Sequence, residues 1–568
     1  GGIGGGVRST STITVPQSAI AEFQVLATGY SAEYGRSTGG VMNTITKSGN
    51  NELHGDGFYQ IRHRALSEFN PVVLIRPSET LQQFGGSIGG PIKKNKLFWF
   101  VAAESQRSAT PRQVVIPSLT GVPVTARNTE AITLLRSFEK GFQQTNRASA
   151  VTAKTDYAFA GGHKLTMRYS FSDSVEKNAV TVGAAVNPVT NNPEENEGNE
   201  LDRIHNGGLQ YTHIFSPSVV NDFKFSGSYE ERPRTANSSN PGVNLQNVST
   251  FGARSFLPTV QSDKRWQITD SVTVLRSKHS VKAGFDFSYL PTAQSFGFNQ
   301  FGNFAVNGVP GAVLDIAGGN GTNGGNRFDS PQVTYNRQIG NLQAAFSAKQ
   351  IAAFVQDSFR ATKRLTLDFG LRWEAQINPE VVANNTTVLN RIEGVRFPIG
   401  NIASPRRIDN NMNQIAPRFG FAWTPFTDQF RTVIRGHTGI FYAATPLITF
   451  ADPTANFRNP PGNVSLAVGG PGTVKTAYQS FLEAGVDLNR TPLTALPVIP
   501  LDIVQRAAAI SVGATARDPF VNAGFTTVAP NFQNPRSFQI GLGTETEWFK
   551  NFTAGIQFNY VNTVHLNR

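Results

Sequence analysis

The sequence predicts an all-β fold, and specifically a transmembrane antiparallel β-barrel. Three observations carry this prediction: segments that alternate between apolar and polar residues, connections that are short and long in turn, and the absence of an apolar run long enough for a membrane helix. A β-strand turns successive side chains to opposite faces, so an alternating segment has one apolar and one polar face. In an outer-membrane barrel the apolar face meets lipid and the polar face lines the lumen.

The clearest alternation occupies residues 365–374. The apolar face consists of Leu365, Leu367, Phe369, Leu371 and Trp373, and the polar face of Thr366, Asp368, Gly370, Arg372 and Glu374. The same pattern recurs in residues 165–172, 281–289 and 552–560, where each apolar face ends in an aromatic residue. Aromatic residues at strand ends are typical of the girdle at the level of the lipid headgroups.

The connections between the alternating segments decide between a membrane barrel and a soluble sandwich. Strands are predicted near residues 52–64, 80–91, 96–108, 149–160, 163–175, 203–216, 218–232, 264–275, 278–290, 346–360, 364–376, 415–425, 430–444, 535–547 and 550–563. Short connections lie at 93–95, 161–162, around 217, at 276–277, 361–363 and 427–429, and around 548–549. Long ones lie at 65–79, 109–148, 176–202, 233–263, 291–345, 377–414 and 445–534. Tight turns at one rim and long loops at the other favour a membrane barrel, because Greek-key connections do not keep this rhythm.

The long loops differ in composition. Residues 301–330 are rich in Gly and Asn, and residues 187–203 in Asn, Glu and Pro, so both are predicted to be mobile and solvated. Helical spacing predicts short helices over 130–141, 474–485 and 501–510. The long loop 445–534 suits a surface lid or a ligand-capturing element. Four loop aromatics are candidate ligand contacts, with packing inside the loops as the simpler interpretation: Phe301, Phe304, Tyr335 and Phe457.

Composition excludes several classes of protein. The longest clean apolar run is residues 97–103, far too short for a transmembrane helix. The chain has no cysteine, which rules out a disulfide scaffold and a cysteine metal site. Its net charge is +12, but the Lys and Arg residues are scattered, which argues against binding to nucleic acid.

No pattern of catalytic residues stands out, so the chain is not expected to be an enzyme. The eight histidines form no HExxH spacing or other metal-ligand spacing, and no Gly-x-Ser-x-Gly segment is present. We therefore predict no metal, no cofactor and no catalytic residue, with a Ser/His/acid set in the lumen or at its rim as the alternative. His437 and Asp286, on predicted luminal faces, are expected to form structural hydrogen bonds.

Several segments carry a family resemblance. They are residues 15–25 (VPQSAIAEFQV), 30–36 (YSAEYGR), 39–49 (GGVMNTITKSG), 54–55 (HG), 83–92 (QFGGSIGGPI), 96–100 (KLFWF), 355–357 (VQD), 365–374, 416–420 (APRFG) and 435–442. In this order they resemble TonB-dependent outer-membrane transporters, and most closely the Oar-like branch. Each segment is moderately specific alone, and the ordered set is strong.

The resemblance implies a domain organisation and a location. Residues 1–50 correspond to the C-terminal part of a plug domain, and residues 51–568 to a partial barrel with long extracellular loops. A complete member resembles a barrel of 22 strands, of which about 15 are present, so the chain is expected to be a fragment. The signal peptide, the TonB box and an N-terminal carboxypeptidase-regulatory-like domain would lie outside it. The implied location is the outer membrane of a Gram-negative bacterium.

The resemblance also implies a function. It is active uptake of a saccharide, a peptide or a metal chelate, driven by the TonB–ExbB–ExbD complex through the TonB box, with outer-membrane lipid as the surrounding partner. The alternative is a surface adhesin or a secretion-linked barrel that does not transport. No ligand-binding residue is assigned.

Six residues are predicted to form the plug: Glu33, Tyr34, Gly35, Arg36, Gly39 and Gly40. The glycines would let the backbone pass close to the barrel wall or adopt a positive φ. Glu33 and Arg36 would pair with charges that face the lumen, or else remain ordinary solvated charges. Residues 41–46 are predicted to form a strand.

Overall fold

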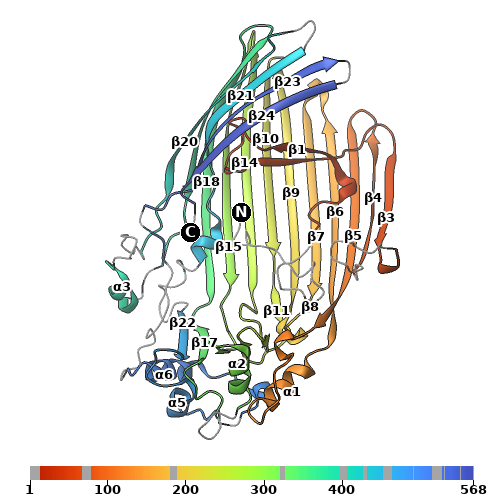
Figure 1. Cartoon of the computed structure of the whole chain (residues 1–568). Coiled ribbons are helices and arrows are strands. Elements are labelled where there is room, and N and C mark those ends of the chain that lie inside the picture. The colour runs from red at the N-terminus through yellow and green to blue at the C-terminus, as the bar shows by residue number, and fades with distance from the viewer. Residues whose placement is uncertain are drawn as a thin grey trace.

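The computed structural model describes residues 13–66, 79–178, 189–319, 326–382, 384, 386–395, 406–426, 431–451, 454, 464–489, 491–514, 527–529, 531–549 and 552–566. No helix among these residues is long and apolar enough to cross a membrane. Fifteen long strands form the wall of a barrel, and short helices and a small separate sheet lie beyond one of its rims (Figure 1).

Each long strand of the wall pairs in antiparallel register with the next one. In order they are β3 (His54–Arg62), β4 (Thr80–Lys93), β5 (Leu97–Val114), β6 (Gly141–Ala158), β7 (Lys164–Lys177), β9 (Gly198–Ser216), β10 (Val219–Glu231), β14 (Val260–Arg276), β15 (His279–Ser295), β18 (Gln343–Arg360), β19 (Leu365–Ile377), β20 (Asn411–Trp423), β21 (Arg431–Tyr442), β23 (Arg536–Phe549) and β24 (Phe552–Val564). All fifteen predicted strands are confirmed. β3 and β24 are the first and last of the series, and nearly all of their residues are exposed.

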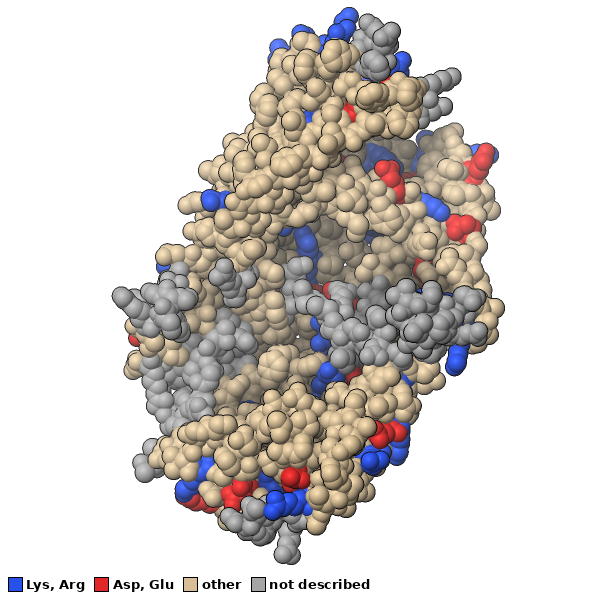
Figure 2. All heavy atoms as spheres, in the orientation of Figure 1, with Lys and Arg blue, Asp and Glu red and all other residues tan. Residues whose placement is uncertain are grey.

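The alternation in the sequence matches the two faces of the wall. On β19, Phe369 and Leu371 are 47% and 48% exposed on the outside, whereas Arg372 and Glu374 are buried on the luminal side. Apolar side chains on the outside are the surface that lipid covers. Figure 2 shows this contrast, with few charges on the upper-left wall and Lys and Arg side chains visible inside the hollow.

The two rims differ as the connection lengths predicted. Tight turns join β4 to β5, β6 to β7, β9 to β10, β14 to β15 and β18 to β19 at one rim (the upper one in Figure 1). The predicted short connection at 427–429 lies outside the described residues. At the other rim several strands extend further than predicted, with β6 starting at Gly141 and β9 at Gly198. This is the rim of the long loops, and therefore the outer one.

Residues 13–50, here called the luminal segment, lie inside the barrel. The segment contains β1 (Ile20–Leu26) and β2 (Val41–Thr46), which pair with each other in antiparallel register and with no strand of the wall among the described residues. The predicted strand at 41–46 is confirmed. In Figure 1, β1 crosses in front of the strands β10 and β14.

Five of the long loops contribute to a unit beyond the outer rim that we call the outer-loop cap. Its five-stranded sheet has the order β13 (Ser249–Phe251), β12 (Gly242–Leu245), β16 (Asn303–Val306), β17 (Val333–Ile339) and β22 (Val464–Gly469). The helices α1 (Thr129–Ser137), α2 (Pro310–Ala317), α5 (Ala477–Glu483) and α6 (Leu501–Ser511) pack around it. Leu389 of α3 (Thr386–Ile392) is fully buried in the same core. Helices predicted over 130–141, 474–485 and 501–510 are confirmed as α1, α5 and α6.

The cap corrects the prediction that residues 301–330 and 187–203 are mobile and solvated. Residues 303–306 form a strand of the cap sheet, and Val313 and Leu314 of α2 are fully buried in the cap core. Part of the other stretch forms the start of β9, where Glu200 is 1% exposed. Gly and Asn are abundant here because the chain must turn tightly between short buried elements. Residues 187–188 and 320–325 lie outside the described residues.

Candidate functional site

The loop between β1 and β2 is attached to the luminal face of the wall through Arg36. Its Nη2 atom lies 2.9 Å from Oδ1 of Asp286 on β15, and both side chains are only 15% exposed. Its Nη1 atom donates to Oγ of Ser288, and its backbone N–H donates to Oε1 of Glu374 on β19 at 3.0 Å. Arg36 therefore joins two separate strands of the wall.

Glu33 makes a second attachment on the same side. Its carboxylate forms an ion pair with Nζ of Lys282 on β15, and its backbone N–H donates to Oε1 of Gln356 on β18 at 3.1 Å. The predicted pairing of Glu33 and Arg36 with luminal charges is confirmed, and neither is an ordinary solvated charge. Their role as plug residues remains a prediction.

Two arginines of the wall hold the backbone of the loop. Arg372, which is 1% exposed, donates from Nη1 to the carbonyl oxygens of Ala32 and Glu33 at 3.2 and 3.3 Å. Arg418 donates from Nη1 to the carbonyl oxygens of Ser31 and Tyr34 at 2.5 and 2.7 Å. Buried carbonyl groups need hydrogen-bond partners, and a charged donor forms a stronger bond than a neutral one.

Sequence reasoning missed both arginines as contacts of the luminal segment. Arg372 stood out as a charge on the polar face of its strand, and Arg418 lay within the segment 416–420 that carries the family resemblance. The two arginines donate to backbone carbonyl groups. Every residue has a carbonyl group, so the sequence of the loop does not show which ones accept these bonds. The only available signal was a guanidinium on a luminal face.

An aromatic contact accompanies the Arg418 bonds. The guanidinium carbon lies 5.0 Å from the ring centre of Tyr30 in the luminal segment and 4.4 Å from that of Phe441 on β21. The two rings are 4.6 Å apart. The arginine is thus covered by rings on the sides where it does not donate, which is favourable for a partly desolvated cation.

The glycines of the plug are predicted either to let the backbone pass close to the wall or to adopt a positive φ. Gly35 fits the first reason and Gly40 fits the second. A Cβ atom on Gly35 would lie 1.9 Å from Oε1 of Glu374, and Gly40 has a φ of +125°. A Cβ atom on Gly39 would have no heavy atom of the described residues within 4 Å. The φ angle of Gly39 is not positive either, so neither reason holds for this glycine. Tyr34 contributes its carbonyl group to Arg418 and lines the luminal cavity described next.

A cavity of about 1040 Å³ separates β2 from the opposite side of the wall. Six basic side chains line it: Arg36, Lys154, Arg168, Lys224, Arg265 and Lys282. Four acidic residues, Glu33, Asp222, Asp270 and Asp286, line it as well. The luminal segment contacts β4 and β5 through Gln17, Ser18 and Ala19, and β15 to β20 through the loop between β1 and β2. Beside it a charged, hollow space remains.

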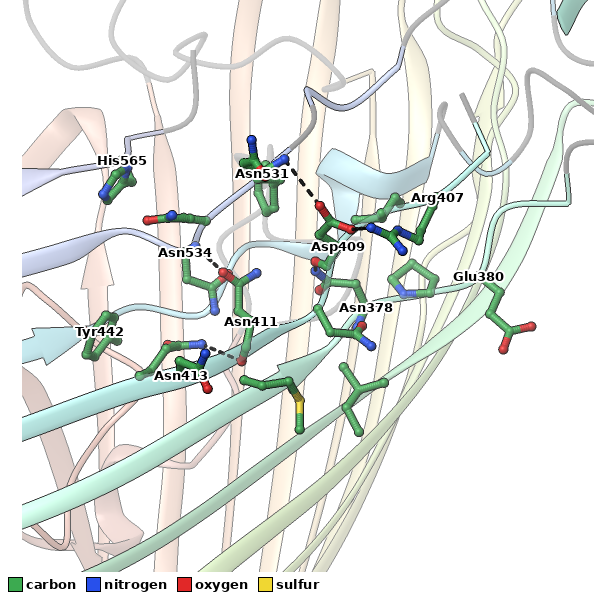
Figure 3. Close-up of a pocket in the computed structure, with 18 of the residues that line it drawn as sticks. Asn378, Glu380, Arg407, Asp409, Asn411, Asn413, Tyr442, Asn531, Asn534 and His565 are labelled. Atoms are coloured by element: carbon green, nitrogen blue, oxygen red, sulfur yellow. Dashed lines mark hydrogen bonds and ion pairs between the residues drawn. The ribbon is translucent and has the colours of Figure 1, made fainter. Parts of the chain in front are cut away.

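A second cavity, of about 850 Å³, lies at the outer rim where β19 and β20 meet the ends of β21, β23 and β24 (Figure 3). Of the twenty-one residues that line it, eight carry a carboxamide: Asn378, Asn410, Asn411, Asn413, Gln414, Asn531, Gln533 and Asn534. We call it the amide cleft. Tyr442 and Phe532 also line it.

The candidate aromatic ligand contacts have different outcomes. Phe304 and Tyr335 are fully buried in the cap core, with ring centres 4.8 Å apart, so they are packing residues. Phe301 is half-buried in a turn just before β16. Phe457 lies outside the described residues.

The predicted structural role is found for Asp286, which accepts from Arg36 and from Nε2 of Gln267. His437 instead packs between two glycines, since a Cβ on Gly29 or Gly541 would lie 2.4 or 2.2 Å from its ring. Within the described residues its Nε2 atom has no hydrogen-bond partner, so the predicted bond is not found there. No group of three or more His, Asp or Glu residues in the described part of the chain could hold a metal ion.

Residues 45–121 and 119–568 match the family model of the outer membrane beta barrel domain. The chain belongs to this family. The barrel is therefore a protein of the Gram-negative outer membrane, as the sequence predicted. Members of the family cross the membrane with strands whose apolar faces meet lipid, which is the arrangement seen on β19.

A curated relative supports the predicted resemblance. The chain is 22% identical over 618 residues to the TonB-dependent transporter Oar of Myxococcus xanthus, covering 95% of this chain and 54% of the relative. The chain thus spans about half the length of that protein. The resemblance to the Oar-like branch is confirmed.

Solved structures share the fold. The outer membrane transporter YddB of Escherichia coli is similar with a TM-score of 0.54 at 10% identity, over 96% of this chain and 56% of that one. A mutant of the ferric enterobactin receptor PfeA of Pseudomonas aeruginosa is similar with a TM-score of 0.52 at 11% identity, over 97% and 59%. At these identities the likeness concerns the fold alone.

Proposed function

We propose that the chain is part of a TonB-dependent transporter that takes up a saccharide, a peptide or a metal chelate across the outer membrane. Residues 1–50 are then the end of the plug, and the rest is barrel wall with its outer loops. The observation that carries the proposal is the attachment of the luminal segment to the wall by Arg36, Arg372 and Arg418. A barrel whose lumen holds a segment of its own chain is built to control passage rather than to leave an open pore.

The chemistry of the attachment suits a segment that is displaced and returns. Most of its contacts are ion pairs and hydrogen bonds. Its apolar contacts are small: Ala19 packs with Phe100 and Ala102 of β5, and Tyr30 packs with Phe441. When the polar contacts break in a wet lumen, water takes over the donors and acceptors, so each contact has a net value of only about 0.5–3 kcal/mol. A pull transmitted by TonB, with ExbB and ExbD as its energised partners, could break them one after another.

The outer-loop cap supports a second candidate function, a surface adhesin that does not transport. Five loops contribute to one unit with its own buried core, which gives the outer face a defined shape. A folded outer unit fits the binding of a surface partner as well as the capture of a substrate. TonB dependence separates the two functions, because adhesion needs no energy from the inner membrane.

Accumulation of substrate with and without TonB tests the proposal. The full-length gene is expressed in matched strains with and without tonB, and labelled oligosaccharides, peptides and ferric chelates are offered to each. Accumulation that depends on both the gene and TonB is the expected result. A folded, surface-exposed barrel that binds cells or matrix but accumulates nothing would overturn the transporter in favour of the adhesin.

A further inference from the structure

We infer that the amide cleft at the outer rim is a binding site for an uncharged oligosaccharide. The idea that the bound sugar is a transported substrate rests on the proposed uptake function. The idea that the cleft binds a sugar does not depend on that function. The cleft is created by an interruption in the wall. β20 pairs with β19 along almost its whole length, from Trp423 to Asn411, but with β21 only from Arg418 to Trp423. Beyond Arg418 the two strands separate, and the cleft opens between them.

The first argument is the chemistry of the lining. Each carboxamide offers two N–H donors and one oxygen acceptor without a charge, which matches hydroxyl groups that both donate and accept. In Figure 3, Asn378, Asn411, Asn413, Asn531 and Asn534 gather around one space, together with Tyr442 and His565. Tyr442 and Phe532 add the ring surface that commonly accompanies a few placed polar groups in binding sites.

The second argument is an unused donor. Asn411 is 8% exposed, and its Oδ1 atom accepts from the backbone N–H of Asn534 at 3.0 Å. Its Nδ2 atom is buried and has no hydrogen-bond partner among the described residues. A buried donor without a partner destabilises the fold, and a ligand that accepts a hydrogen bond from it removes that penalty.

The third argument is that the cleft is held in shape from behind. Asn534 donates from Nδ2 to Oε1 of Gln376 at 3.0 Å and accepts from the hydroxyl of Thr445 at 2.7 Å. Gln376 donates in turn to Oδ1 of Asn378. These four side chains are all nearly buried, so the lining is positioned before a ligand arrives.

Charge argues against an anionic ligand. Three arginines line the cleft, and two of them are already paired: Arg406 with Glu393 and Arg407 with Asp409. The third arginine is Arg536, and Glu380, which also lines the cleft, carries a negative charge that offsets it in the sum of formal charges. The region therefore has no net formal charge with which to attract a carboxylate, a phosphate or an anionic chelate.

The backbone argues against a peptide added as a strand. A peptide would need the free edge of β20, but two carbonyl groups of this stretch are already occupied. Met412 accepts from Nε1 of Trp373 and Asn411 accepts from Nε2 of Gln414. Pro417 has no N–H group that could donate to a peptide strand. The pairing of β19 with β20 also has a register shift between Glu374 and Gln376, opposite the same stretch of β20. An oligosaccharide needs no such edge.

The test is binding by the purified full-length protein in detergent to an array of neutral oligosaccharides, charged oligosaccharides and capped neutral tetrapeptides. The strongest ligand is then titrated by calorimetry against two variants and a control. Asn411→Asp keeps the acceptor for Asn534 and removes the unused donor, while Asn413→Ala removes an exposed lining amide. Asn199→Ala, at the outer rim of β9 and outside the cleft, is the control.

The expected result is binding of at least one neutral oligosaccharide, weakened about tenfold by Asn411→Asp and by Asn413→Ala and unchanged by Asn199→Ala. Binding only of peptides or of charged sugars would overturn the ligand class. Sugar binding that both cleft variants leave unchanged would overturn the site. Sugar binding at the cleft without TonB-dependent accumulation would support the site while contradicting the uptake function.

Discussion

The luminal segment and the outer-loop cap are both built from non-wall parts of the chain, but the luminal segment is held mainly by polar contacts and the cap mainly by apolar ones. The luminal segment is attached by ion pairs and by arginines that donate to its carbonyl groups. The cap is held by an apolar core that includes Phe304, Tyr335 and Phe481, all fully buried. Polar attachments exchange readily with water, whereas an apolar core opens as a unit. The difference indicates that the luminal segment is the part suited to displacement and the cap the part suited to keep its shape.

The largest expected change in stability is that of the cap. Phe304→Ala removes a buried ring that contacts Phe328 and Tyr335, with ring centres 4.6 and 4.8 Å away, and should destabilise the cap by about 3–5 kcal/mol. Hydrogen exchange should rise across the cap strands and stay unchanged in the luminal segment. Phe298→Ala is the control, because that ring is 46% exposed in the same loop. Equal loosening of both regions would show that they are not independent.

The second largest expected change is in the attachment of the luminal segment to the wall. Arg418→Leu leaves the carbonyl groups of Ser31 and Tyr34 without their donor. The free energy that holds the luminal segment on the wall should fall by about 1–3 kcal/mol for each lost bond. Cells carrying the full-length variant should become more permeable to large antibiotics. Arg435→Leu is the matched control, since Arg435 lies on β21, is exposed and pairs only with Glu545 among the described residues. Unchanged permeability would mean that Arg418 does not hold the segment.

The ion pair between Arg36 and Asp286 should have a smaller effect. In a double-mutant cycle with Arg36→Ala and Asp286→Ala, a coupling energy of about 1–2 kcal/mol is expected, because the pair is mostly but not wholly buried. The charge-reversed double variant Arg36→Asp with Asp286→Arg should recover part of the loss. Hydrogen exchange of residues 28–40 measures each variant, and strictly additive single effects would contradict the pairing.

The smallest effect concerns the pH dependence of the cap. Burial raises the pKa of the Tyr335 hydroxyl to about 12, above its ordinary value of 10, and the nearby Arg337 offsets this only in part. The folded cap thus retains the phenolic proton more tightly than the unfolded chain does. This contribution to stability is fully present below pH 10 and is lost as the pH rises through 12. An absorbance titration of Tyr335→Phe against the parent protein checks this, and an ordinary tyrosine transition would contradict the burial.

The wall was predictable because its signal is local. Alternation with a period of two marks each strand, as on β19, and the polar turns between strands mark the rims. Helical spacing located α1, α5 and α6 for the same reason. The cap sheet was not predictable, because β12 and β13 have only four and three residues. The parallel pairing of β12 with β16 also joins loops about sixty residues apart.

The site was predictable only in part. Glu33 and Arg36 were recognisable as charges in a segment expected to lie in the lumen, but their partners Lys282 and Asp286 are far away in sequence. Arg372 and Arg418 act on backbone carbonyl groups, which are the same in every residue type. The amide cleft depends on the separation of β20 from β21, and the alternation of either strand contains no sign of it.

The central claim is that the luminal segment leaves the wall during function, and the accessibility of Ala32 tests it most directly. Ala32 is 1% exposed and lies against Gly370 on β19. These 568 residues contain no cysteine, so Ala32→Cys adds the one thiol in them, and any cysteine elsewhere in the full-length protein is replaced by serine. The full-length variant is labelled with a membrane-impermeant maleimide in growing cells that have or lack TonB and are supplied with substrate. We predict labelling with TonB and protection without it. Equal labelling in both strains would contradict the claim.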